Sequence, residues 1–121
     1  SKEIDYSRAL LQTETKEVGK QKVQIHRLSI PRGETFKVVL SEGTEVFLNS
    51  DSRLAYPTVF KGKERVVSLE GEAYFKVAKD AAHPFIVKSG NLQIRVLGTE
   101  FNVRSYSPTE SVLRSLQEKW L

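Results

Sequence analysis

Short runs of alternating apolar and polar residues constrain the fold of this chain more than any other feature. In one such run Ala73, Phe75 and Val77 fall on the same face of an extended segment. The intervening Tyr74 and Lys76 fall on the opposite face. Turn-forming residues separate the runs, which recur at roughly 8–12-residue spacing and so predict an all-β antiparallel sandwich or barrel. The expected strands cover residues 23–26, 35–40, 45–48, 54–57, 64–69, 73–77, 85–88, 92–96 and 101–104.

The two ends of the chain depart from this pattern. The first 21 residues are polar and predict an arm or a short edge strand. Near the other end Ser107 can cap a helix, Pro108 suits its first position and Glu110 can close a capping box. Apolar residues then recur on one helical face. The predicted parts are an N-terminal arm or edge strand at 1–21, a β-domain at 22–106, and a short C-terminal helix or the start of a following domain at 107–121.

Composition excludes several classes of protein. The 121-residue chain has no cysteine, which excludes a disulfide framework, a zinc knuckle, an iron–sulfur cluster and a catalytic thiol. No apolar run reaches the ~18 residues that a transmembrane helix needs, and no signal peptide opens the chain. Because the chain begins with Ser1 and contains no methionine, we expect it to be a piece of a longer protein.

The charge is mildly basic and predicts no nucleic-acid partner. Lys+Arg is 19 and Asp+Glu is 15, a net charge of +4, and the basic residues are dispersed along the sequence. The densest group is Lys61, Lys63 and Arg65, which share one face of an extended segment. We interpret this group as a solvated hairpin rather than a site for nucleic acid or an anionic membrane.

The residue types that carry catalysis or metal binding are sparse. His26 and His83 have no partner at a spacing typical of metal ligands, so we interpret both as surface or edge histidines. Glu70 and Glu72 flank Gly71 and could form a glycosidase-type carboxylate pair, but solvated acids at a bend are the simpler interpretation. The sequence therefore predicts no enzyme activity and no catalytic, cofactor-binding or metal-binding residues.

The aromatic residues offer two interpretations. Most alternate with apolar neighbours, which favours packing in a core over a sugar-stacking surface. Phe47 is the exception, because it shares a face with Glu45 and Asn49 and can be exposed. The set comprises Phe36, Phe47, Tyr56, Phe60, Tyr74, Phe75, Phe85, Phe101 and Tyr106.

Three motifs in order resemble a known family. They are LSEGTEVFLNSDSRLAYP at 40–57, RVVSLEGEAYFKVAKD at 65–80, and HPFIVK at 83–88 followed by LGTEFNVRSY at 97–106. Together they are similar to the FecR-like domain family and cover about residues 28–106. Long, dissimilar motifs in a fixed order make this resemblance specific.

The resemblance implies a fold and a function. The expected fold is a jelly-roll-like antiparallel β-sandwich, in the periplasmic domain of a single-pass inner-membrane anti-sigma factor. The cytoplasmic part of such a protein holds an extracytoplasmic-function sigma factor. The outer partner is typically the signalling domain of a TonB-dependent outer-membrane receptor that imports an iron–siderophore or a glycan. Oligomeric state is left open.

This sequence departs from the family pattern at two points, and two alternative functions stand beside the one that the resemblance implies. The family usually continues with further strands where residues 112–121 read as a helix, and the sigma-binding segment is absent from this sequence. One rival is a carbohydrate-binding jelly-roll module that stacks sugars on exposed aromatic rings. The other is a cupin-like metalloenzyme, which is weakened because two histidines cannot supply the usual histidine cluster.

Overall fold

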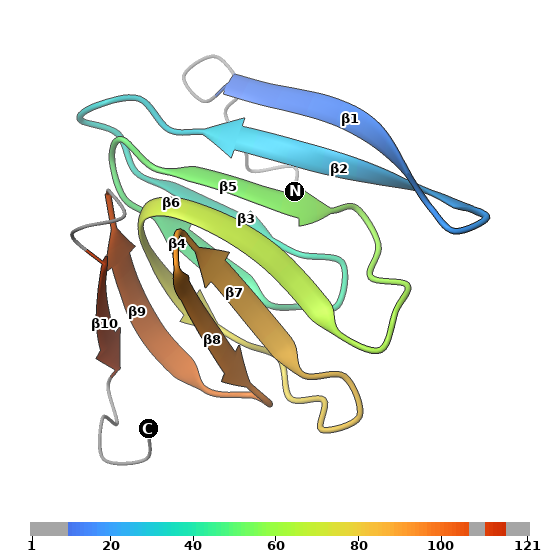
Figure 1. Cartoon of the computed structure of the whole chain (residues 1–121). Helices are drawn as coiled ribbons and strands as arrows, with labels where there is room; N and C mark the ends of the chain where they lie inside the picture. Colours follow the sequence, from blue (N-terminus) through green and yellow to red (C-terminus); the bar gives the residue numbers. More distant parts are fainter. Residues whose placement is uncertain (1–9, 107–110, 116–121) are drawn as a thin grey trace.

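The computed structural model describes residues 10–106 and 111–115, which form ten strands and no helix within those ranges (Figure 1). The predicted all-β fold is confirmed. The strands are β1 (Leu10–Val18), β2 (Gln21–Ser29), β3 (Phe36–Val39), β4 (Glu45–Leu48), β5 (Arg53–Pro57), β6 (Arg65–Lys76), β7 (Phe85–Ser89), β8 (Leu92–Val96), β9 (Glu100–Ser105) and β10 (Ser111–Ser115).

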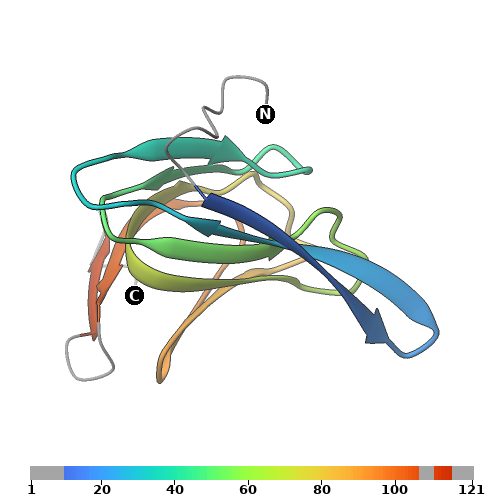
Figure 2. The same ribbon diagram turned by 90° about the horizontal axis from the view of Figure 1, so that it is seen from above.

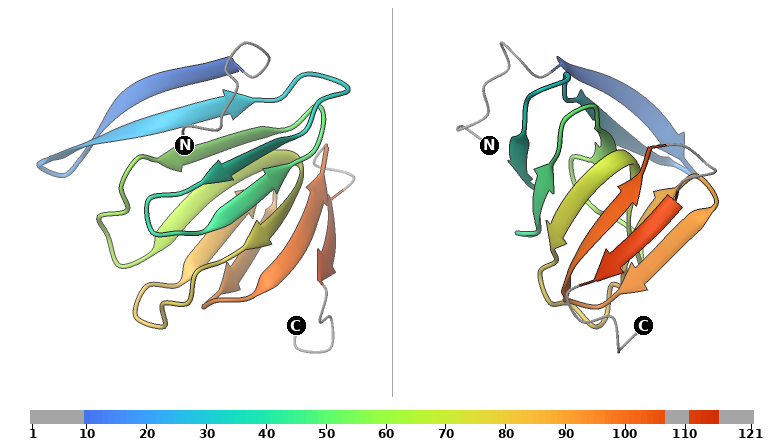
Figure 3. Two further views of the ribbon diagram at one scale, coloured as in Figure 1. Left: turned by 180° about the vertical axis from the view of Figure 1, so that it is seen from behind. Right: turned by 90° about the vertical axis from the view of Figure 1, so that its left-hand side faces the viewer.

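The strands make one continuous, curled sheet with two halves. Sheet A has the order β1-β2-β5-β6-β7-β8, and sheet B has the order β3-β4-β6-β9-β10. Every neighbouring pair is antiparallel except β6 and β7, which are parallel. The sheet curls around β6 so that the two halves enclose a common interior (Figures 2 and 3).

The strand β6 belongs to both halves because it bends at Gly71. Residues before the bend pair with β5 and β7, and residues from Gly71 onward pair with β4 and β9. Gly71 has φ +112, and a Cβ there would lie 2.4 Å from Ser52 Oγ and 2.7 Å from Ser52 Cα. The hydroxyl of Ser52 accepts from Glu72 N at 2.9 Å and donates to Glu72 O at 3.1 Å. The sequence predicted two strands separated at this glycine, whereas the structure has one bent strand.

We expect Gly71→Ala to lower the free energy of unfolding by about 1–3 kcal/mol, the usual cost of holding a non-glycine residue in such a conformation. The new methyl group also meets the backbone of Ser52, which cannot rotate away. Denaturant unfolding measures the loss. Gly62→Ala is the matched control, because its nearest atom would be Glu64 N at 4.0 Å. Equal midpoints for the two variants would contradict this account of the bend.

The inner faces of both halves share one hydrophobic core. Phe75 lies at its centre, stacked on Phe101 with ring centroids 5.2 Å apart and tilted against Phe85 at 6.0 Å. The facing predicted for Ala73, Phe75 and Val77 is correct, because all three are buried. Residues from sheet A and sheet B contribute about equally, among them Leu28, Leu54, Val67, Leu69, Val87, Val46, Leu48, Ala73, Val103 and Val38.

The helix expected near the C-terminus is not found where the structure describes that region. Residues 111–115 form β10, which pairs antiparallel with β9 from Ser111 opposite Ser105 to Ser115 opposite Phe101. The edge of β9 presents unpaired backbone groups, and pairing with them satisfies the backbone of this segment in place of helical bonds. The remainder of the expected helix, 107–110 and 116–121, lies outside the described residues.

Candidate binding surface

The two histidines lie in separate places. His26 is half-buried on β2 with its ring edge against Tyr56, centroids 5.5 Å apart. His83 is exposed, and its Nδ1 lies 2.8 Å from Asp80 Oδ2. This hydrogen bond holds the pKa of the Asp80 carboxyl below its ordinary value. Across the described ranges, no group of three or more histidine, aspartate or glutamate residues could hold a metal ion.

Glu70 and Glu72 do not act together. The bend at Gly71 sends Glu70 to the outer face of sheet A, where its Oε1 lies 3.4 Å from Arg53 Nη1. Glu72 lies on the outer face of sheet B, where its carboxylate accepts from Asn49 Nδ2 at 3.2 Å and from Asn102 Nδ2 at 2.9 Å. The two carboxylates therefore line different hollows of the surface.

Arg65 contradicts the interpretation of its segment as a solvated face. Its side chain is 3% exposed, and its guanidinium lies 5.3 Å from the centroid of the Phe85 ring. Nη1 donates to Glu42 Oε2 at 2.6 Å, and Nε donates to His83 O at 2.7 Å. Three further backbone carbonyls accept from the same group, those of Ala78, Asp80 and Leu97. Arg65 is thus a structural residue that joins four segments of the chain.

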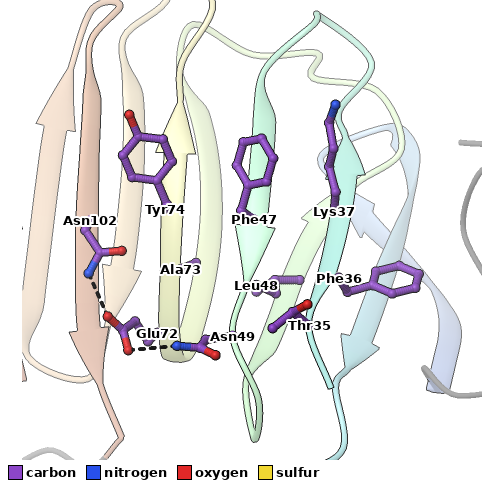
Figure 4. A pocket seen from close by; sticks show the side chains of 10 residues that line it. All are labelled: Thr35, Phe36, Lys37, Phe47, Leu48, Asn49, Glu72, Ala73, Tyr74 and Asn102. Atoms are coloured by element: carbon purple, nitrogen blue, oxygen red, sulfur yellow. Dashed lines mark hydrogen bonds between the residues drawn. The ribbon is translucent and has the colours of Figure 1, made fainter. Parts of the chain in front are cut away.

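The outer face of sheet B carries a row of four aligned side chains. The register places Lys37 of β3 opposite Phe47 of β4, and Phe47 opposite Tyr74 of β6. Tyr74 in turn lies opposite Asn102 of β9. The row borders a shallow hollow of about 450 Å³ (Figure 4). The hollow is lined by Thr35, Phe36, Lys37, Phe47, Leu48, Asn49, Glu72, Ala73, Tyr74 and Asn102.

The aromatic part of this face is packed side by side. The rings of Phe47 and Tyr74 lie 6.0 Å apart at 49°, and the Lys37 ammonium lies 5.5 Å from the Phe47 centroid. The Tyr74 hydroxyl donates to the Glu100 carboxylate. The polar part lies beside it, where Asn49 and Asn102 hold the Glu72 carboxylate between them (Figure 4). These contacts fix the side chains in advance, which lowers the entropic cost of binding a partner.

We expect the hydroxyl of Tyr74 to ionise at a higher pH than that of an ordinary tyrosine. Burial, followed by its hydrogen bond to Glu100 and the charge of Glu100, raises the pKa of Tyr74 to about 12. A raised pKa means that the folded state keeps a proton that the unfolded state has lost. This contribution to stability is therefore full below pH 10.0 and is lost as the pH rises to about 12. Ultraviolet titration of phenolate absorbance should show one late step that Tyr74→Phe removes; the same late step in that variant would contradict the assignment.

Only part of this face could be predicted from local sequence patterns. Phe47 stood out because its neighbours at two-residue spacing are polar, and the structure shows it half-buried on the outer face. Tyr74 and Lys37 show the same signal, since they fall on the polar side of their strands. Their alignment depends on strand register across sheet B, which a single sequence does not reveal. Tyr106 Oη donates to Ser50 O at 2.9 Å, in the turn that precedes β5.

Comparison with known proteins gives consistent matches. A family model described as FecR protein matches residues 26–115. Two crystal structures, each described as a candidate anti-sigma factor from Parabacteroides distasonis, are similar to this chain with TM-scores of 0.68 and 0.66 at 41% and 42% sequence identity. The matches cover 69% and 67% of this chain, but only 39% and 38% of those chains. No curated protein sequence matches. Among the described residues, no helix is long and apolar enough to cross a membrane.

Proposed function

This chain belongs to the FecR family, and from that premise we propose that it is the periplasmic signalling domain of a transmembrane anti-sigma factor. The observation that carries the proposal is the family match over residues 26–115. It is supported by the 41% identity to a solved candidate anti-sigma factor with the same fold. The proposed role is regulatory and involves no catalysis.

The proposal places the parent protein in the inner membrane with one membrane-spanning segment. A cytoplasmic part, outside this sequence, would hold an extracytoplasmic-function sigma factor. The β-domain would contact the signalling domain of a TonB-dependent outer-membrane receptor that imports an iron–siderophore or a glycan. The sequence of the parent gene before Ser1 tests the placement: it should encode an apolar span of about 20 residues. The lack of such a span on either side of this domain would count against it.

We assign the receptor contact to the outer face of sheet B. Aromatic rings at the centre with polar and charged groups at the edge are typical of protein–protein interfaces. Phe47, Tyr74 and Lys37 supply this combination within one hollow. Receptor loading would change the population of the docked state, and that shift would pass through the parent chain to the sigma factor.

A reporter driven by the sigma factor tests this assignment in cells that express the full parent protein. We expect Phe47→Ser with Lys37→Glu to abolish the response to the receptor's ligand while leaving sigma-factor binding intact. The matched control is Leu97→Ser with Lys88→Glu, because both residues are exposed away from this face. An unchanged response in the first variant, at normal protein levels, would refute the docking face.

The second candidate is a carbohydrate-binding module, which the same hollow favours because its rings and amides suit a sugar. Calorimetry of this chain against glycans and siderophores separates the two functions. The signalling proposal predicts no saturable binding to either. Saturable binding of a glycan, lost in Phe47→Ser, would replace the protein-contact function with sugar recognition.

A further inference from the structure

One end of the molecule is formed by two segments that are distant in the sequence. The β1–β2 hairpin extends beyond the end of β5. β2 pairs with β1 along its whole length but with β5 only from Ile25 to Ser29. The β5–β6 connection lies against the base of this extension (Figures 1 and 2). Thr58 N donates to Gln24 O at 2.8 Å, and Lys61 Nζ donates to Lys22 O at 3.3 Å. We call this region the hairpin end; it comprises residues 15–24 and 58–63.

The net charge of the chain resides at the hairpin end. Five exposed lysines lie there with one exposed acid, Glu17. Removing these six residues from the totals of 19 Lys+Arg and 15 Asp+Glu leaves 14 of each sign. The neighbouring Glu64 does not offset the lysines, because it pairs with Arg95 at 2.9 Å. The five lysines are Lys16, Lys20, Lys22, Lys61 and Lys63.

None of these lysines forms an ion pair with another residue that the structure describes. Several basic side chains elsewhere on the described surface are paired, as Arg27 is with Glu14 and Arg53 is with Glu70. The charge dispersed along the sequence is therefore concentrated in space. This clustering cannot be seen in the sequence, because Lys22 and Lys61, which are joined by a hydrogen bond, are 39 residues apart along the chain.

An apolar feature accompanies the charge. Val59 is 50% exposed at the hairpin end. It borders a hollow of about 500 Å³, which Val23 also lines between the two segments. Lysines surrounding exposed apolar side chains are typical of surfaces that bind anionic lipid. Lysine ammonium groups act as point charges rather than bidentate forks, which suits a charged plane better than one carboxylate or phosphate group.

We propose that the hairpin end binds the surface of a bilayer that contains anionic phospholipid. Each lysine near such a surface is worth about fivefold in partitioning. Four net positive charges therefore give a contact that is weak for the free domain, with a partition coefficient on the order of 10³ M⁻¹. Attachment to the same membrane makes such a contact effective by raising the local concentration. This biological setting rests on the proposed function, whereas lipid binding by the isolated chain does not.

Vesicle sedimentation with this 121-residue chain tests the proposal. We expect binding to phosphatidylglycerol-containing vesicles at millimolar lipid, no binding to pure phosphatidylcholine, and loss of binding as salt shortens the range of the charges. The triple variant Lys20→Gln, Lys22→Gln, Lys61→Gln should bind about a hundredfold more weakly. The control variant Lys76→Gln, Lys79→Gln, Lys88→Gln removes the same charge from exposed positions elsewhere and should bind nearly as well as the parent.

Three results would overturn the proposal: equal losses in the two triple variants, binding to both vesicle types, or binding to polyglutamate in preference to the anionic vesicles. The last would identify an acidic protein as the partner. Circular dichroism of each variant confirms that it is folded. Because no receptor or sigma factor is present in this experiment, its failure leaves the signalling proposal untouched, and failure of the reporter test leaves lipid binding untouched.

Discussion

Replacing Arg65 with methionine is expected to lower the free energy of unfolding by about 3–5 kcal/mol, the usual effect of removing one member of a buried ion pair. The substitution keeps the apolar stem but removes the donors to Glu42 and to four backbone carbonyls. Because Glu42 also accepts from Thr44 Oγ1 at 2.5 Å, its carboxylate keeps one partner. The carbonyls of Ala78 and His83 lose their Arg65 donor, which adds to the penalty.

Chemical denaturation of Arg65→Met beside Arg32→Met measures this effect. Arg32 is the matched control because its side chain is 90% exposed and makes one long contact, 3.7 Å, to Asp51. We expect the control to change stability by less than about 0.5 kcal/mol. Arg65→Lys should fall between the two, since one ammonium keeps the charge but cannot reach all five acceptors. Unfolding of Arg65→Met at the same denaturant concentration as the control would show that the buried network does not stabilise the fold.

Replacing Phe75 with alanine is expected to lower the free energy of unfolding by about 3–5 kcal/mol. The ring is fully buried and contacts Phe85 and Phe101, so its removal leaves a cavity at the meeting point of both halves of the sheet. Phe101→Ala should cost a similar amount. Because the two rings stack on each other, the double variant should lose less than the sum of the single losses.

The matched control for Phe75→Ala is Phe47→Ala, which makes the same change on the opposite face of sheet B. Phe47 is half-buried and lies opposite Tyr74, one register position from the Phe75–Val46 pair. We expect the control to lose less stability, since part of its ring surface stays in contact with solvent in the folded state. A near-zero effect for Phe75→Ala together with a large effect for Phe47→Ala would mean that the inner and outer faces are reversed.

The strand β6 shows most clearly which features of the fold could be predicted from the sequence. Alternation placed Val67, Leu69 and Phe75 on inward faces, and all three are buried. Arg65 has the same parity as Val67, so the period of two already pointed its side chain inward. The interpretation that its charged side chain lies on the surface was wrong, because its hydrogen-bond partners come from distant segments of the chain. Local alternation predicts on which face of a strand a side chain lies. It does not predict which carbonyls and carboxylates will surround a buried cation.

The candidate surface and the C-terminal segment show the same limit. Phe47 and Tyr74 each carry a local sign of exposure, but only strand pairing puts them in one row with Lys37. Residues 111–115 have a pattern that fits one helical face, but in the structure they form a strand by pairing with the edge of β9. In both cases a non-local partner decides the outcome, and no window of one sequence contains that partner.

The bend in β6 has a consequence for how the protein opens. A strand whose first half hydrogen-bonds to β5 and β7 and whose second half hydrogen-bonds to β4 and β9 cannot leave one half-sheet while remaining in the other. Sheet A and sheet B are therefore one cooperative unit. Amide protons along the whole of β6 should exchange with solvent only through global unfolding, at a single free energy on both sides of Gly71. For a signalling domain this means that a partner bound to one sheet stabilises the other by the same amount.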